Sequence, residues 1–313
     1  GPMEVGGFPY RLALTVAEPA MTQAGSGLNW TSRRITLFAQ PWNPRHLIAD
    51  AEGPHVLTWL DQGGPRLARL DAEKLRASVV TADGGWRRAS LEMTGANGDL
   101  AGQRVTVARL MAHARRAETG PGIDLALEAD NLALPADSGP WGALGRVVGN
   151  VRFEATANGA WPGGPVMEAL GAGSDSGGIV DVEQLRVAFE RVTISGNGAI
   201  GLDPAWRPLG AFSLEIKGHN ALIDAFVAGG GMSARDAQVA RIALGLLSKP
   251  AANGEPMVSA PVTAQDGRLF VGPVAVSRLR PIFSALPFSG QASQVPPAAG
   301  DRNSAPSPPA PRQ

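Results

Sequence analysis

The residues that could carry chemistry begin with a glycine-rich stretch at 196–201, Gly-Asn-Gly-Ala-Ile-Gly, which matches the GxGxxG fingerprint of dinucleotide sites. That fingerprint works only between a strand and a helix, because the helix N-terminus receives the pyrophosphate. Here Leu202, Asp203 and Pro204 follow, and we expect no helix to begin at that point. We therefore interpret the match as accidental and expect no cofactor.

Other candidate groups also lack the spacing that their chemistry requires. The serine-rich segment at 173–177 is not a nucleophile elbow, because Asp175 stands where GxSxG needs serine, and we interpret it as a flexible loop. Pairs of Asp and Glu could form a glycosidase site, but the sequence singles out no two of them. We expect no metal site and no triad among the histidines, which are His46, His55, His113 and His219. The chain is therefore predicted not to be an enzyme.

Composition sets further limits. The 313 residues include 28 basic and 28 acidic side chains, a balance that argues against nucleic acid as a partner and against strong adhesion to an anionic membrane. No cysteine is present, so disulfides and thiolate sites are excluded. No run approaches the roughly 18 apolar residues of a membrane span. Gly1 and Pro2 resemble the scar of a protease cleavage, so we interpret 1–3 as a tag remnant after which an anchor is missing.

The strongest pattern lies at 192–249. Apolar residues alternate at 192–202 and again at 212–216, which predicts a hairpin of two half-buried strands. Pro204 and Pro208 place the connection between them, and the small Gly196 and Gly198 leave room on the inner face or mark a bulge. The strands should bend there.

Two helices are predicted after the hairpin. The first, around Leu222 to Val227, should end at the glycines 229–231. The second should start at the N-cap Ser233, with Asp236 at the third helical position, and stop before Pro250. Its predicted buried stripe is Val239, Ile242, Ala243, Leu246 and Leu247.

The rest of the chain is rich in short alternating segments. These predict a mainly β (α+β) fold with curved antiparallel sheets that form a groove or open barrel, and two or three helices packed at one side or end. We divide the chain into a β-rich half at 4–162, hairpins plus helices at 179–288, and a Pro/Ala/Ser-rich disordered tail at 289–313. The glycine-rich run at 171–178 is the predicted boundary.

The seven tryptophans fall near predicted strand ends and corners. An indole at such a place usually closes the edge of a core with its N–H outward. The alternative is that these rings line the mouth of an apolar groove. They lie at 30, 42, 59, 86, 141, 161 and 206.

Several motifs occur in a recognisable order: 6–16 (GGFPYRLALTV), 39–44 (AQPWNP), 199–214 (from Ala199 to Leu214) and 266–283 (DGRLFVGPVAVSRLRPIF). Together they resemble the bacterial family named domain of unknown function 2125. That resemblance implies a periplasmic protein tethered to the inner membrane by an N-terminal helix that precedes the segment at 6–16. More loosely, the strand pattern is similar to that of AsmA-like envelope lipid-transfer proteins.

Two functions follow from this interpretation. The first is a periplasmic carrier or bridge for a lipid or other apolar molecule, held in a groove and working with envelope transport partners; an acyl chain needs only an apolar wall. The second is a structural or partner-binding envelope protein with closed sheets. For the first, the predicted ligand-binding residues are Ile194, Ile200, Leu202, Phe212, Leu214 and Ile216.

Overall fold

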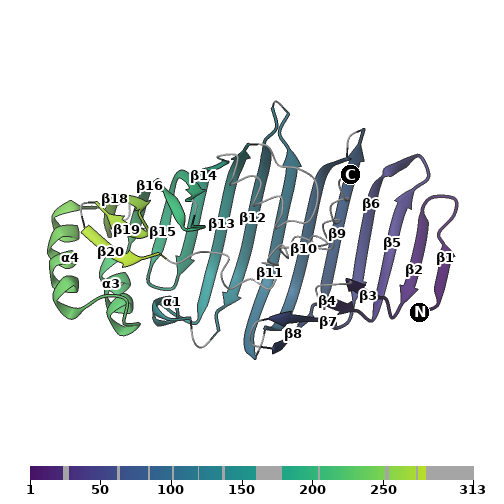
Figure 1. Ribbon diagram of the computed structural model, residues 1–313, viewed down its shortest axis with the longest axis horizontal. Helices are drawn as coiled ribbons and strands as arrows, with labels where there is room; N and C mark the ends of the chain where they lie inside the picture. The colour runs from purple at the N-terminus through teal and green to yellow at the C-terminus, as the bar shows by residue number, and fades with distance from the viewer. Residues whose placement is uncertain are drawn as a thin grey trace, which may run out of the picture.

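A computed structural model describes the chain at 1–23, 28–61, 64–83, 85–100, 102–118, 120–135, 138–159, 178–203, 205–250, 254–272 and 274–279. These residues form a 20-stranded sheet whose strand pairs are antiparallel (Figure 1). The mainly β fold with helices at one end is therefore confirmed, and within the described residues the sheet is open. The predicted loop at 173–177, Trp161 and the predicted tail at 289–313 lie outside the described residues.

The main ladder of the sheet runs from the N-terminal strand to the last described strand. In spatial order it contains β1 (Met3–Gly6), β2 (Leu12–Ala17), β5 (Arg34–Gln40), β6 (Asn43–Glu52), β9 (Lys74–Ala82), β10 (Gly85–Leu100), β11 (Gln103–Arg116), β12 (Ile123–Ala133), β13 (Val147–Asn158), β14 (Ile179–Phe189), β15 (Thr193–Leu202), β16 (Pro208–Lys217), β18 (Pro256–Gln265), β19 (Arg268–Val271) and β20 (Val274–Arg278). Since β13 pairs with β14, the two predicted halves share one sheet.

A short branch leaves the main ladder at the far end of β10. It contains β8 (Gly64–Asp71), β7 (His55–Asp61), β4 (Leu28–Thr31) and β3 (Ala20–Gln23), paired in that order, and lies along the lower edge of the sheet in Figure 1. The branch buries Leu28 and Trp59, while Trp30 stacks on His55 with ring centroids 6.1 Å apart. Two of the tryptophans thus fill a local core, as the first interpretation of these residues expects.

Three helices are described, and α3 (His219–Ala228) and α4 (Ala234–Leu247) cover the C-terminal end of the sheet (Figure 1). The Ser233 hydroxyl accepts a hydrogen bond from the Asp236 backbone N–H at 3.1 Å, so the predicted N-cap is confirmed. After α4, the short strand β17 (Ser248–Pro250) pairs with β18. Beside α3 lies α1 (Pro140–Ala143), where Trp141 packs edge-on against Phe226. No helix of the described chain is long and apolar enough to span a membrane.

The predicted buried stripe of α4 is wrong. Val239, Ile242 and Leu246 are 55%, 63% and 83% exposed, whereas Ala237 and Ala240 are buried against Ile223 of α3. The helix is rotated from the predicted orientation, so that the small side chains of Ala237 and Ala240 face α3. Apolar periodicity alone cannot tell such a small-residue contact face from a row of larger side chains next to it.

The hairpin predicted from the alternation at 192–202 and 212–216 is confirmed as β15 and β16. The irregularity beside its glycines, however, lies in the neighbouring strand. The register of β14 against β15 shifts between Val182 and Leu185, opposite Gly198 and Gly196. On the other side β16 comes close: a Cβ at Gly198 would lie 2.3 Å from the Ala211 carbonyl oxygen. Glycine is therefore required by the close approach of the two backbones.

A single added methyl group tests this close approach. Gly198→Ala should lower the free energy of unfolding by about 1–3 kcal/mol, because the facing backbone has to move. Gly201→Ala on the same strand is the matched control, since its Cβ would meet no heavy atom nearer than the 3.5 Å of the Gly178 carbonyl oxygen. Denaturant melts of both variants measure the difference. Equal stability for the two would contradict the role assigned to Gly198.

Candidate ligand-binding face

One face of the main ladder is apolar on consecutive strands. Alternate residues of a strand point to the same side, and the registers align these residues from strand to strand. One such row starts at the N-terminal end of the ladder and contains, strand by strand, Val5, Leu14, Leu37, Ala49, Ala77, Leu91, Ala112, Leu127, Phe153 and Leu185. It continues through Gly196 and Leu214 to Ala260. We call this surface the apolar face.

The apolar face is covered at one end and open at the other. Near the helices, Ile216, Val258 and Ala260 are only 4%, 0% and 3% exposed. Near the N-terminal end, Leu12 and Leu47 remain 43% and 48% exposed. Side chains with the same alternating pattern therefore form a core at one end and an accessible surface at the other.

Between these ends the apolar face contains a hollow of about 470 Å³ over β9 to β13. Such a volume lies within the range of ligand sites, roughly 300–1,000 Å³. The hollow forms because small alanine side chains line part of this surface and larger side chains lie beside them. The surface is therefore depressed where the alanines lie. The lining on the apolar face consists of Ala77, Val79, Ala89, Leu91, Ala112, Ala114, Leu125, Leu127 and Phe153. Ser78, Ser90, His113 and Ala126 alternate with these residues along the same strands and also border the hollow.

The six ligand-binding residues predicted from the sequence lie on β15 and β16. Ile194 faces Ile216, and Leu202 faces Pro208 across the hairpin. Ile216 is buried, while Ile194, Ile200, Leu202, Phe212 and Leu214 are half-buried. The hairpin is separated from the hollow by β14, so the sequence pattern did not point to the residues that line it. Residues of the lining such as Ala77, Val79, Leu125 and Leu127 do alternate in the sequence, but any half-buried strand shares that alternation.

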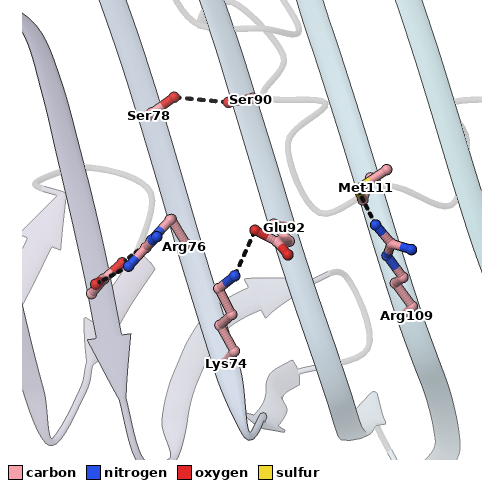
Figure 2. A network of polar contacts seen from close by, with 8 residues as sticks. Lys74, Arg76, Ser78, Ser90, Glu92, Arg109 and Met111 are labelled. Carbon is pink, nitrogen blue, oxygen red and sulfur yellow. Dashed lines mark hydrogen bonds and ion pairs between the residues drawn. The ribbon is translucent and has the colours of Figure 1, made fainter.

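The opposite face of the same strands is polar. Figure 2 shows its centre, where Arg76 donates two hydrogen bonds to Asp50 and Lys74 donates to Glu92 at 2.8 Å. The Arg76 hydrogen bonds lower the pKa of Asp50, and the Lys74 hydrogen bond lowers that of Glu92. Ser78 and Ser90 lie 2.8 Å apart, and Arg109 contacts the Met111 sulfur (Figure 2). These pairs are only partly buried, so each adds little stability, but together they favour one register.

A polar hollow of about 480 Å³ lies over β10 to β14 on this second face. Within it, the Thr156 hydroxyl lies 2.9 Å from Glu183 Oε1 and 3.2 Å from Asp124 Oδ1, with one proton to donate to either, and Asp124 also accepts from Arg115 at 2.8 Å. Both carboxylates are thus tied into cross-strand contacts. This arrangement supports the sheet and provides a hydrophilic outer surface.

The sequence profile of a family described as an uncharacterized protein conserved in bacteria (DUF2125) matches residues 1–280. The chain belongs to the DUF2125 family. No curated protein and no solved structure matches this DUF2125 chain. The resemblance in the ordered motifs is therefore confirmed, while the similarity of pattern to AsmA-like proteins stays a prediction.

The four histidines of this DUF2125 protein lie on different elements: His46 on β6, His55 on β7, His113 on β11 and His219 at the start of α3. Within the described residues no group of three potential metal ligands occurs. His55 and His219 are 7% and 4% exposed, and burial lowers the pKa of each. The Nδ1 atom of His219 is buried without a hydrogen-bond partner, which also favours the neutral ring.

This burial predicts a loss of stability in mild acid. Below about pH 6.5 the unfolded chain takes up protons at these histidines before the folded chain does, so the free energy of unfolding falls as the pH falls towards the lowered pKa values. Between pH 7.5 and pH 5, the free energy of unfolding of His219→Leu should therefore fall less than that of the wild type, by on the order of 1 kcal/mol. Denaturant melts across this range measure it, with His113→Asn as an exposed control. A His219→Leu slope equal to that of the wild type would refute the assignment.

Proposed function

We propose that this DUF2125 protein binds a lipid or another elongated apolar molecule on its apolar face. The observation that carries the proposal is the half-exposed hollow of about 470 Å³, whose wall is almost entirely apolar. A ligand there needs no catalytic group, because each CH₂ that leaves water contributes about 0.8 kcal/mol. The rows of apolar residues on either side would let a long chain lie across several strands.

The proposed setting is the bacterial envelope. The resemblance in the motif at 6–16 supports a periplasmic protein held at the inner membrane, where a carrier or bridge would meet other transport proteins. In this proposal the protein carries its ligand and does not transform it. A structural or partner-binding protein is the alternative, and the experiments below distinguish the two.

The first test is direct. Protein purified without detergent is extracted with organic solvent, and the extract is analysed by mass spectrometry beside a blank from a control protein. A co-purified lipid at near-stoichiometric amount supports the carrier. The extracted protein is then offered a fluorescent fatty acid, and a protein that holds no lipid and takes up none would sink the proposal.

A matched pair of variants separates the open surface from the closed core. Leu47→Gln changes a 48% exposed residue of the apolar face that pairs with Val79 at the border of the hollow. Stability should stay within about 0.5 kcal/mol while fatty-acid affinity falls roughly ten-fold through lost apolar contact. Ile216→Ala, at a site 4% exposed, should cost about 2–5 kcal/mol through lost burial and a cavity but leave the affinity nearly unchanged.

Denaturant melts and fatty-acid titrations measure the two effects for each variant. Affinity that responds to Ile216→Ala and not to Leu47→Gln would place the ligand at the hairpin of β15 and β16. A stability loss in both variants with no measurable binding would favour the structural alternative.

A further inference from the structure

Several hairpin turns lie along one edge of the sheet. Ala82 pairs with Gly85, Leu12 with Ala39, and Arg116 with Ile123, so the β1–β2, β5–β6, β9–β10 and β11–β12 connections all reach the same side of the ladder. Figure 1 shows these connections along the upper edge. We call this edge the turn rim and define it by 7–11, 41–46, 83, 85–88 and 115–118.

The turn rim exposes large aromatic side chains. Phe8 and Tyr10 of the first turn are each 80% exposed, and Trp42 of the second is 65% exposed. Trp86 stands at the third turn, half-buried beneath the guanidinium of Arg116, which lies 5.4 Å from its ring centroid. On a soluble surface, aromatic rings exposed in a row are a mark of an interaction site.

Arginines accompany these rings. Arg11 lies 5.1 Å from the Phe38 ring centroid, and the rim also exposes Arg45, Arg87, Arg88, Arg115 and Arg116. Its acidic residues are fewer: Asp83 pairs with Arg45 at 2.8 Å, and Glu118 is the other one within the defined rim. Arg115 also pairs with Asp124, which lies across the strand pair just outside the defined rim. This edge is therefore basic, although the whole chain has no net charge.

We infer that the turn rim docks on the surface of a lipid bilayer that contains anionic lipids. Tyrosine and tryptophan favour the headgroup region, where one part of the ring is apolar and the other is wet. Arginine side chains lay their stems along apolar surface while the guanidinium reaches phosphate, and anionic headgroups attract them further.

A bilayer fits this rim better than a protein partner does. Protein interfaces concentrate their energy in a central, well-packed pocket. The rim instead distributes its aromatic residues over turns that are separated by pairs of strands, roughly 10 Å from one turn to the next. A fluid surface can receive every turn without a matching shape. Docking would also bring Leu12 and Leu47 of the apolar face close to the membrane, although the docking itself does not depend on any bound ligand.

Vesicle flotation tests the inference with the whole chain. The probes are phosphatidylcholine vesicles and vesicles of phosphatidylcholine with one quarter phosphatidylglycerol. The wild type should bind the anionic vesicles and lose binding as salt rises. Arg11→Gln, Arg87→Gln and Arg88→Gln combined should weaken binding roughly a hundred-fold, since each basic residue near an anionic surface contributes roughly five-fold.

A second variant removes the aromatic residues, with Phe8→Ser, Tyr10→Ser and Trp42→Ser combined, and should weaken binding to both kinds of vesicle. The matched control is Ile242→Ser with Leu246→Ser on α4, which removes equally exposed apolar side chains at the other end of the sheet and should change binding less than two-fold. Thermal melts of each variant verify folding.

Three outcomes would overturn the inference: no binding to either vesicle, binding that survives both rim variants, or binding that the α4 control abolishes. The last would assign the contact to α4. Fatty-acid binding is measured separately without vesicles, so a failure of the ligand proposal and a failure of the docking inference remain distinguishable.

Discussion

The alternation of side chains along the strands, interrupted at register shifts such as that in β14 between Val182 and Leu185, is the constraint on which the structure depends. Because successive residues point to opposite faces, a strand with apolar residues at every second position presents them all on one side. Antiparallel pairing in a fixed register then joins these rows into one surface, and a slip of one residue would turn a whole row towards the polar side. The ion pairs of the second face, such as Arg76 with Asp50 and Arg152 with Glu128, join residues that lie directly opposite each other and so favour this register. Each pair is weak, yet together they keep the apolar side continuous.

The apolar surface is stabilised unevenly along the ladder. Around α1 and α3, Val192 and Phe189 join Leu144, Val148 and Ala225 in a buried cluster, and Val258 is fully buried on β18. At the β1 end, the strands rely mainly on backbone pairing and on half-exposed side chains. Local opening costs least where few apolar contacts have to be broken. We therefore expect the β1 end to open first, which is also the end where the apolar face is accessible to a ligand.

Features that depend on neighbouring residues could be predicted from the sequence. Features that form only when distant strands or helices come together could not. The hairpin of β15 and β16 and the N-cap Ser233 follow from neighbouring residues, and both are confirmed. The face of α4 could not be predicted, because the alanines that contact α3 carry a weaker signal than the exposed Val239 and Ile242. The hollow also escaped prediction: Ala77, Ala112 and Phe153 are distant in sequence, and alternation is identical whether a face is covered or open. Likewise, Phe8, Trp42 and Trp86 become neighbours along one edge only through the registers of the strands between them.

The apolar face and the turn rim meet, and their chemistry is complementary. Leu12 follows directly on the turn that carries Tyr10 and Arg11, and Leu47 lies two residues beyond Arg45. An amphipathic lipid has the same two parts, an acyl chain and a phosphate headgroup. A chain on the apolar wall would leave its headgroup near arginines, which bind phosphate well because their N–H groups match its oxygens. A fatty alcohol carries no anionic group, so it would make the wall contacts without this second set. A lysophospholipid should therefore bind more tightly than a fatty alcohol of equal chain length, and the excess should weaken with salt.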